Sequence, residues 1–144
     1  MRHGEAGEAR VDAERALTPR GRAQATATAT GLLRLGIAVP VIRHSPYRRA
    51  TETATAVAAV LGSTLVVDDR FTPSSSPDVA VDALLAERTG TFVVAHLPLL
   101  AGIVEQLVGA RVQFATASVA HVVVDGGTGV LAGFWSSAGL ERVS

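Results

Sequence analysis

The stretch Thr91-Phe92-Val93-Val94-Ala95-His96-Leu97-Pro98 contains the pattern that decides the fold. Its first five residues form a continuous apolar and β-branched run, which is typical of a strand buried on both faces of a sheet. A histidine ends the run, and Pro98 supplies the fixed backbone angle with which many helices begin. The stretch therefore predicts a buried strand over 91–95 and a helix over 98–108 that ends at Gly109, with a histidine at the junction.

The same alternation of apolar runs and helical segments extends in both directions along the chain. Further strands are predicted over 40–43, 64–67, 118–124 and 129–135, and the turn Asp125-Gly126-Gly127 joins the last two as a hairpin. Further helices are predicted from Thr18 to Leu35, from Arg48 to Leu61 and from Ser76 to Arg88. We therefore expect a three-layer α/β/α sandwich with a mostly parallel central sheet and a C-terminal hairpin.

Length and composition limit the classes of protein to which the chain can belong. The 144 residues correspond to a single domain over 1–144, and 48% hydrophobic residues are enough for a core. With 13 basic and 13 acidic residues, a general attraction to nucleic acid or to a membrane surface is not expected. The absence of cysteine excludes disulfides and thiol catalysis. Because no apolar run could span a bilayer and no signal peptide is evident, we expect a cytoplasmic protein, and a monomer.

Histidines and arginines gather where an open α/β sheet binds its ligands, at the carboxyl ends of the strands. His3 follows Arg2 at the start of the chain, His44 is followed by Arg48-Arg49, and His96 ends the run 91–95. Arginine presents paired donors that fit phosphoryl oxygens, and a neutral imidazole can attack phosphorus and carry the phosphoryl group. The pattern therefore predicts a site for a phosphate dianion.

These motifs resemble those of the histidine phosphatase (phosphoglycerate mutase-like) superfamily. Arg2-His3-Gly4-Glu5 resembles its RHG signature, the segment from Ser45 to Ala54 resembles its second motif, and Val94-Ala95-His96-Leu97-Pro98 resembles its third. The His-Leu-Pro form, together with Ala16-Leu17-Thr18-Pro19, is similar to the SixA-type phosphohistidine phosphatase branch. The likeness covers essentially the whole chain, with the motifs in the same order.

The resemblance implies a role for each residue that matches a motif. His3 is the expected nucleophile, which forms a covalent phosphohistidine, while Arg2, Arg49 and His96 hold the phosphoryl oxygens in the transition state. The backbone at Gly4 is expected to fix the tautomer of His3 by accepting a ring N–H. The other residues expected to contact the phosphate are Gly4, Arg15 and Ser45. Neither a metal nor a cofactor is expected.

The start of the chain departs from the family pattern. The superfamily has several apolar residues of a central strand before its RHG motif, whereas only Met1 precedes Arg2 here. We therefore expect a truncated first strand, which means either that the start is misassigned or that His3 hangs on a frayed terminus.

The lack of a clear match to the catalytic acid of larger family members is a second departure from the family pattern. Larger members supply a carboxylic acid after the second motif to protonate an alcohol leaving group, and no residue here matches it clearly. The weak candidates are Asp68, Asp69 and Glu5. Because imidazole leaves more easily than an alkoxide, an acid-poor site favours hydrolysis of P–N over P–O bonds.

The leading hypothesis is a phosphatase that removes phosphate from histidine on a protein partner through a covalent intermediate on His3. One alternative is a broader phosphomonoesterase for small phosphorylated molecules, which would need a working acid. The other is a non-catalytic module that binds phosphate or a phosphoprotein, and the short first strand is the feature that suggests it.

Overall fold

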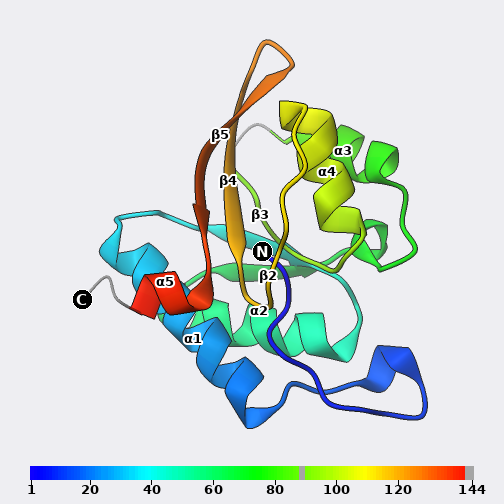
Figure 1. Ribbon diagram of the computed structural model, residues 1–144, viewed down its shortest axis with the longest axis vertical. Helices are drawn as coiled ribbons and strands as arrows, with labels where there is room; N and C mark the ends of the chain where they lie inside the picture. Colours follow the sequence, from blue (N-terminus) through cyan, green and yellow to red (C-terminus); the bar gives the residue numbers. More distant parts are fainter. Residues whose placement is uncertain (88–89, 142–144) are drawn as a thin grey trace.

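The computed structural model describes residues 1–87 and 90–141, which form two sheets flanked by helices (Figure 1). The parallel sheet has the order β2 (Thr64–Val67), β1 (Val41–His44) and β3 (Phe92–Val94). An antiparallel hairpin consists of β4 (Val119–Asp125) and β5 (Thr128–Trp135). The mostly parallel sheet and the C-terminal hairpin expected from the sequence are both confirmed.

Helices cover both faces of the parallel sheet. They are α1 (Pro19–Arg34), α2 (Arg48–Leu61), α3 (Pro77–Leu85), α4 (Leu99–Val108) and α5 (Ser137–Glu141), with the short 3₁₀ turns η1 (Asp12–Glu14) and η2 (Asp69–Phe71). Val94 of β3 packs with α1 and α2, in a core that includes Leu32 and Val57. Its neighbour Val93 faces the opposite way, into a core that α3 and α4 build around Leu99. This alternation along one strand places a helical layer on each side of the sheet.

Local signals explain most of the element boundaries. Thr18 accepts a hydrogen bond from the Gly21 amide at 3.0 Å and caps α1, as Ser and Thr do at many helix starts. Gly62 and Gly109 end α2 and α4 in the left-handed conformation, with φ of 70° and 72°.

One predicted helical boundary needs correction, and one helix was not predicted. The helix expected to reach Arg88 ends at Leu85, and Glu87 beyond it forms an ion pair with Arg43 of β1. Arg88 itself lies outside the described residues. The short α5 was not predicted, and its Leu140 packs over Gly31 of α1, where a Cβ would leave it no room.

Residues 1–3 enter between β3 and the segment that leads into β4. The amide of His3 donates to the Ala95 carbonyl at 3.1 Å, and the amide of Ala95 donates to the Met1 carbonyl at 3.1 Å. On the other side, the amide of Arg2 donates to the Ser118 carbonyl at 3.0 Å. Only an isolated bridge forms here, between Arg2 and Ala95. The prediction that His3 hangs on a frayed terminus is nevertheless wrong, because backbone hydrogen bonds hold this segment from both sides.

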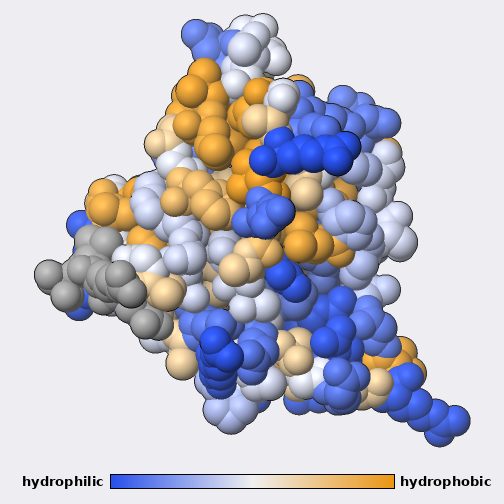
Figure 2. All heavy atoms as spheres, viewed as in Figure 1, coloured by the Kyte–Doolittle hydropathy of each residue, from blue (hydrophilic) through white to orange (hydrophobic). Residues whose placement is uncertain are grey.

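The hairpin presents apolar side chains to the surface. Figure 2 shows hydrophobic residues gathered over the upper part of the molecule, where Figure 1 places β4 and β5. Val123, Val130 and Phe134 are among the exposed large hydrophobic residues of the hairpin. Within residues 1–87 and 90–141, no helix is both long and apolar enough to cross a membrane.

The backbone after His3 crosses the start of α1 at a distance that only glycine allows. A Cβ added to Gly21 would overlap the carbonyl oxygen of Glu5, whereas a Cβ on Gly7 would have no atom nearer than 4.0 Å. We expect Gly21→Ala to lower the free energy of unfolding by about 2–4 kcal/mol, because the two backbones must separate. Gly7→Ala is the matched control and should change it by less than about 1 kcal/mol. Urea unfolding followed by circular dichroism tests this, and equal effects of the two variants would contradict the close contact.

Candidate active site

His3 lies in the described structure with a defined ring orientation. Its Nδ1 atom lies 2.7 Å from the carbonyl oxygen of Gly4, so the ring proton resides on Nδ1 and is donated to that oxygen. The other ring nitrogen, Nε2, accepts a hydrogen bond from Nε of Arg49 at 3.2 Å. The Nε2 lone pair of His3 therefore points toward a guanidinium, the group that best complements phosphoryl oxygens.

Helix α2 brings Arg49 to this ring. Thr53, one turn further along the helix, accepts a hydrogen bond from the Gly4 amide at 3.0 Å and donates to the Arg49 carbonyl at 2.7 Å. Thr53 therefore ties the backbone that follows His3 to the helical turn that carries Arg49. This link fixes the distance between the imidazole and the guanidinium.

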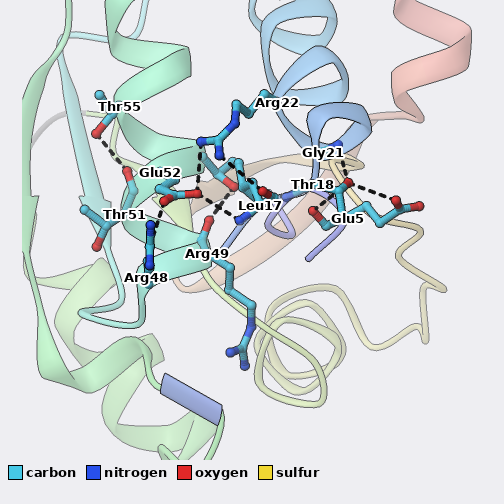
Figure 3. A network of polar contacts seen from close by, with 12 residues as sticks. Glu5, Leu17, Thr18, Gly21, Arg22, Arg48, Arg49, Thr51, Glu52 and Thr55 are labelled. Carbon is cyan, nitrogen blue, oxygen red and sulfur yellow. Dashed lines mark hydrogen bonds and ion pairs between the residues drawn. The ribbon is translucent and has the colours of Figure 1, made fainter. Parts of the chain in front are cut away.

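A polar network anchors the segment between His3 and α1 to the same helix (Figure 3). Glu52 accepts hydrogen bonds from the Leu17 amide at 2.8 Å, from Arg48 at 2.9 Å and from Arg22 at 3.2 Å. The side chain of Arg49 points away from this network, as Figure 3 shows. Glu52 thus anchors the segment between His3 and α1, whereas Arg49, one turn earlier on the same helix, faces His3.

His96 and Arg2 bring further nitrogen atoms to the site. The imidazole rings of His3 and His96 have centroids 5.1 Å apart, and Arg2 donates to the Phe114 carbonyl at 2.8 Å. Both ring nitrogens of His96 and Nε of Arg2 are buried without a hydrogen-bond partner in the described structure. Buried polar atoms of native proteins are nearly always paired, so Nε of Arg2 and the protonated ring nitrogen of His96 fit a ligand with acceptor oxygens.

Both histidines of the site are neutral at pH 7. Burial lowers the pKa of His3 to about 4; the hydrogen bond to Gly4 opposes this shift, and the charge of Arg49 adds to it. Burial, with the charges of His3 and Arg49, lowers the pKa of His96 to about 3. The positive charge of the site therefore resides on arginines, and the His3 ring keeps the lone pair that a nucleophile needs.

The sequence analysis missed one residue that the structure places here, Asp12 of η1. Its carboxylate pairs with Arg49 at 3.0 Å and with Arg15 at 3.2 Å, and its carbonyl oxygen accepts from Arg49 at 2.7 Å. Arg15 also donates to the Gly7 carbonyl at 2.8 Å, which holds it beside the site. The available signal was the spacing of an aspartate three residues before an arginine on one helical turn.

The other residues nominated from the sequence make local contacts of their own. Ser45 is fully buried, and its hydroxyl accepts a hydrogen bond from the Tyr47 amide at 3.3 Å. Glu5 accepts from Thr18 at 2.9 Å and pairs with the exposed Arg20. Asp69 begins η2, and Asp68 pairs with Arg70 and Arg43. The hydrogen bond from Arg70 lowers the pKa of Asp68, so this carboxyl group is ionised at neutral pH.

Comparison of the sequence with known protein families gives one match. Residues 1–73 match the model of the histidine phosphatase superfamily (branch 1). The chain belongs to the histidine phosphatase superfamily. The resemblance stated from the motifs is thereby confirmed, and it makes the protein a phosphatase. A search of curated protein sequences found no match.

Solved structures support the same assignment. In the structure of the protein histidine phosphatase SixA complexed with tungstate, the protein has 28% sequence identity to this chain. The two superpose with a TM-score of 0.92, over 97% of this chain and 96% of that one. A putative phosphohistidine phosphatase SixA from Agrobacterium tumefaciens shares the fold at 21% identity, with a TM-score of 0.84 over 94% of each chain. Phosphoserine phosphatase from Entamoeba histolytica shares the fold at 18% identity, with a TM-score of 0.73 over 96% of each chain.

The arginine side chains described above bring positive charge to the candidate site. Within residues 1–87 and 90–141, no group of three or more His, Asp or Glu residues could hold a metal ion. Arg2, Arg15 and Arg49 supply cations that stay charged at neutral pH.

The two buried histidines should make folding sensitive to acid. Their pKa values in the folded protein lie near 4 and 3, below the ordinary 6.5. As the pH falls below 6.5, the unfolded chain therefore binds more protons than the folded protein does. Stability is therefore complete above pH 6.5 and declines below it. We expect the free energy of unfolding to fall by about 1–2 kcal/mol per histidine between pH 6.5 and 5.

Urea titrations at a series of pH values measure this decline. His96→Gln should reduce the slope in that window, whereas the matched control His121→Gln, at an exposed position of β4, should keep it. An unchanged slope in His96→Gln would show that His96 does not titrate as described.

Proposed function

We propose that the protein hydrolyses phosphohistidine on a protein partner, with His3 as the nucleophile. The observation that carries this proposal is the neutral ring of His3, whose Nδ1 donates to Gly4 and whose Nε2 faces Arg49. A neutral imidazole whose Nε2 lone pair lies beside a buried guanidinium suits in-line attack on a phosphoryl group, once phosphoryl oxygens replace that lone pair as acceptors from Arg49.

The first step transfers the phosphoryl group to the enzyme. Nε2 of His3 forms a bond to phosphorus while the P–N bond of the substrate breaks, and its electron pair leaves with the substrate imidazole. Arg2, Arg49 and His96 hold the three phosphoryl oxygens as charge develops. The His3 ring becomes cationic, and its Nδ1–H bond to the Gly4 carbonyl stabilises that charge.

The second step returns the enzyme to its starting state. A water molecule attacks phosphorus, the bond to His3 Nε2 breaks, and inorganic phosphate leaves with the water proton passing to phosphate or solvent. His3 recovers its neutral form, which its lowered pKa favours. The same arginines serve both steps, because the phosphoryl oxygens stay in place.

The contacts of the nearby carboxylates indicate which leaving group the site favours. Of the acid candidates, Glu5 contacts Thr18 and Arg20, and Asp68 is ionised within its pairs with Arg70 and Arg43. An alkoxide leaving group needs a proton donor, whereas imidazole departs without one when its other nitrogen is protonated. The exposed rim at residues 8–12 also leaves the site open to a protein-borne substrate.

Loss of the nucleophile should abolish turnover. We expect His3→Ala to reduce phosphate release from a histidine-phosphorylated protein domain at least about a thousandfold, because no covalent intermediate can form. Arg49→Ala should lower it at least about a hundredfold through lost charge stabilisation. The exposed neighbour Arg48→Ala is the matched control and should stay near the unmutated rate.

Substrate choice is tested in the same assay with an aryl phosphate in parallel, and circular dichroism checks that each variant is folded. Release from the phosphohistidine substrate alone supports the proposal. Comparable efficiency with the aryl phosphate would favour a general phosphomonoesterase. Release from neither substrate, with phosphate still bound, would favour a binding module.

A further inference from the structure

Asp12 stands at the opening of the site and connects its inner and outer cations. Its side chain is 56% exposed, whereas that of its partner Arg49 is only 5% exposed. The carboxylate uses one oxygen for Arg49 and the other for Arg15. Asp12 is therefore reachable by a group that arrives from solvent, while it touches the guanidinium that faces His3.

The carboxylate stays ionised and retains acceptor capacity. Slight burial raises the pKa of Asp12, but hydrogen bonds and charges from Arg15 and Arg49 outweigh it, so the pKa lies below its ordinary value. A carboxylate offers about four lone-pair positions, and each oxygen here accepts from one arginine side chain. An additional N–H donor on the solvent side can therefore be accommodated.

This chemistry matches a group in the substrate class proposed above, on which the inference rests. Phosphohistidine carries phosphorus on one ring nitrogen, and its P–N bond breaks most readily when the other nitrogen is protonated. We propose that Asp12 accepts a hydrogen bond from that second ring N–H and so makes the site selective for P–N over P–O bonds.

The protons and electrons balance without a proton donor from the enzyme. The substrate ring enters as a cation with a proton on the nitrogen that does not bear phosphorus. His3 Nε2 forms the new bond to phosphorus, and the electron pair of the broken P–N bond neutralises the departing ring. The proton stays on that ring throughout, and ionised Asp12 stabilises the protonated form by accepting its hydrogen bond.

The same carboxylate disfavours other ligands. An oxyanion leaving group such as a phenolate would meet the negative charge of Asp12, and an alkoxide would find no proton there. Inorganic phosphate must compete with Asp12 for Arg49, because both anions use the same guanidinium. The charged groups that face Asp12 are Arg15 and Arg49, and its charge also raises the pKa of His96, which remains neutral near pH 7.

The variant Asp12→Asn tests this inference, because it removes the charge and keeps the shape and the backbone bond to Arg49. We expect kcat/KM for a phosphohistidine-containing peptide to fall at least about tenfold. Hydrolysis of p-nitrophenyl phosphate should stay level or rise, and inhibition by inorganic phosphate should become stronger. Glu14→Gln, at an exposed position of the same turn, is the matched control and should leave all three unchanged.

A pH profile separates recognition of the ring from simple positioning. In the unmutated protein, Asp12 holds the proton on the bound ring, so the alkaline limb of kcat for the peptide should move to lower pH in Asp12→Asn, by about one unit. A variant that merely displaced Arg49 would leave this limb in place.

Three results would overturn the inference. Equal losses on the peptide and the aryl phosphate, or weaker inhibition by phosphate, would mean that Asp12 only positions Arg49. No change on either substrate would mean that it has no role. If the unmutated protein does not hydrolyse the peptide, the proposed function itself fails, and that failure is visible before any variant is made.

Discussion

The structure depends on three residues that lie between the parallel sheet and the segment that leads into the hairpin. Residues 1–3 exchange backbone hydrogen bonds with Ala95 on one side and with Ala117 and Ser118 on the other. Because His96 directly follows Ala95, this pairing sets the His3 and His96 rings at a centroid distance of 5.1 Å. Every other part of the site is arranged around that pair. Helix α2 reaches it through Thr53, and the segment after His3 can pass only because the first turn of α1 has a glycine, Gly21, at the crossing.

The electrostatics of the site follow from which bases keep their charge when buried. Imidazoles give up their proton under burial, and both site histidines do so. Guanidinium groups keep theirs, so a phosphate site lined by arginine remains cationic at any physiological pH. The chain has 13 Lys and Arg residues in total, and all of them are arginine, so arginine alone supplies the lasting positive charge of the site. Asp12 balances part of the buried charge at the point where the site meets solvent.

The sequence predicted the parts of this structure that depend on local periodicity and on start and stop residues. The helix over 48–61 and the strand over 64–67 lie where the apolar runs and glycines placed them. The helix at 137–141 was missed, since five residues carry no helical period and its packing on α1 is a tertiary contact. The backbone hydrogen bond that fixes His3 was missed for a related reason, because the residue that accepts it, Ala95, is remote in sequence. Asp12 was overlooked because its importance appears only through Arg49, which a one-dimensional pattern does not join to it.

The contrast between the floor and the rim of the site bears on how its substrate range can change. The floor consists of main chain and buried side chains: Gly4 and Gly21 leave no space for a Cβ, and Thr53 bonds to both sides of the site. Substitution there disturbs folding before it alters selectivity. Residues 8–11 are exposed, and unlike Asp12 they do not pair with Arg49. Sequence libraries confined to residues 8–11 would therefore vary what the enzyme accepts while sparing the residues beneath, which is how new specificities arise on an unchanged scaffold.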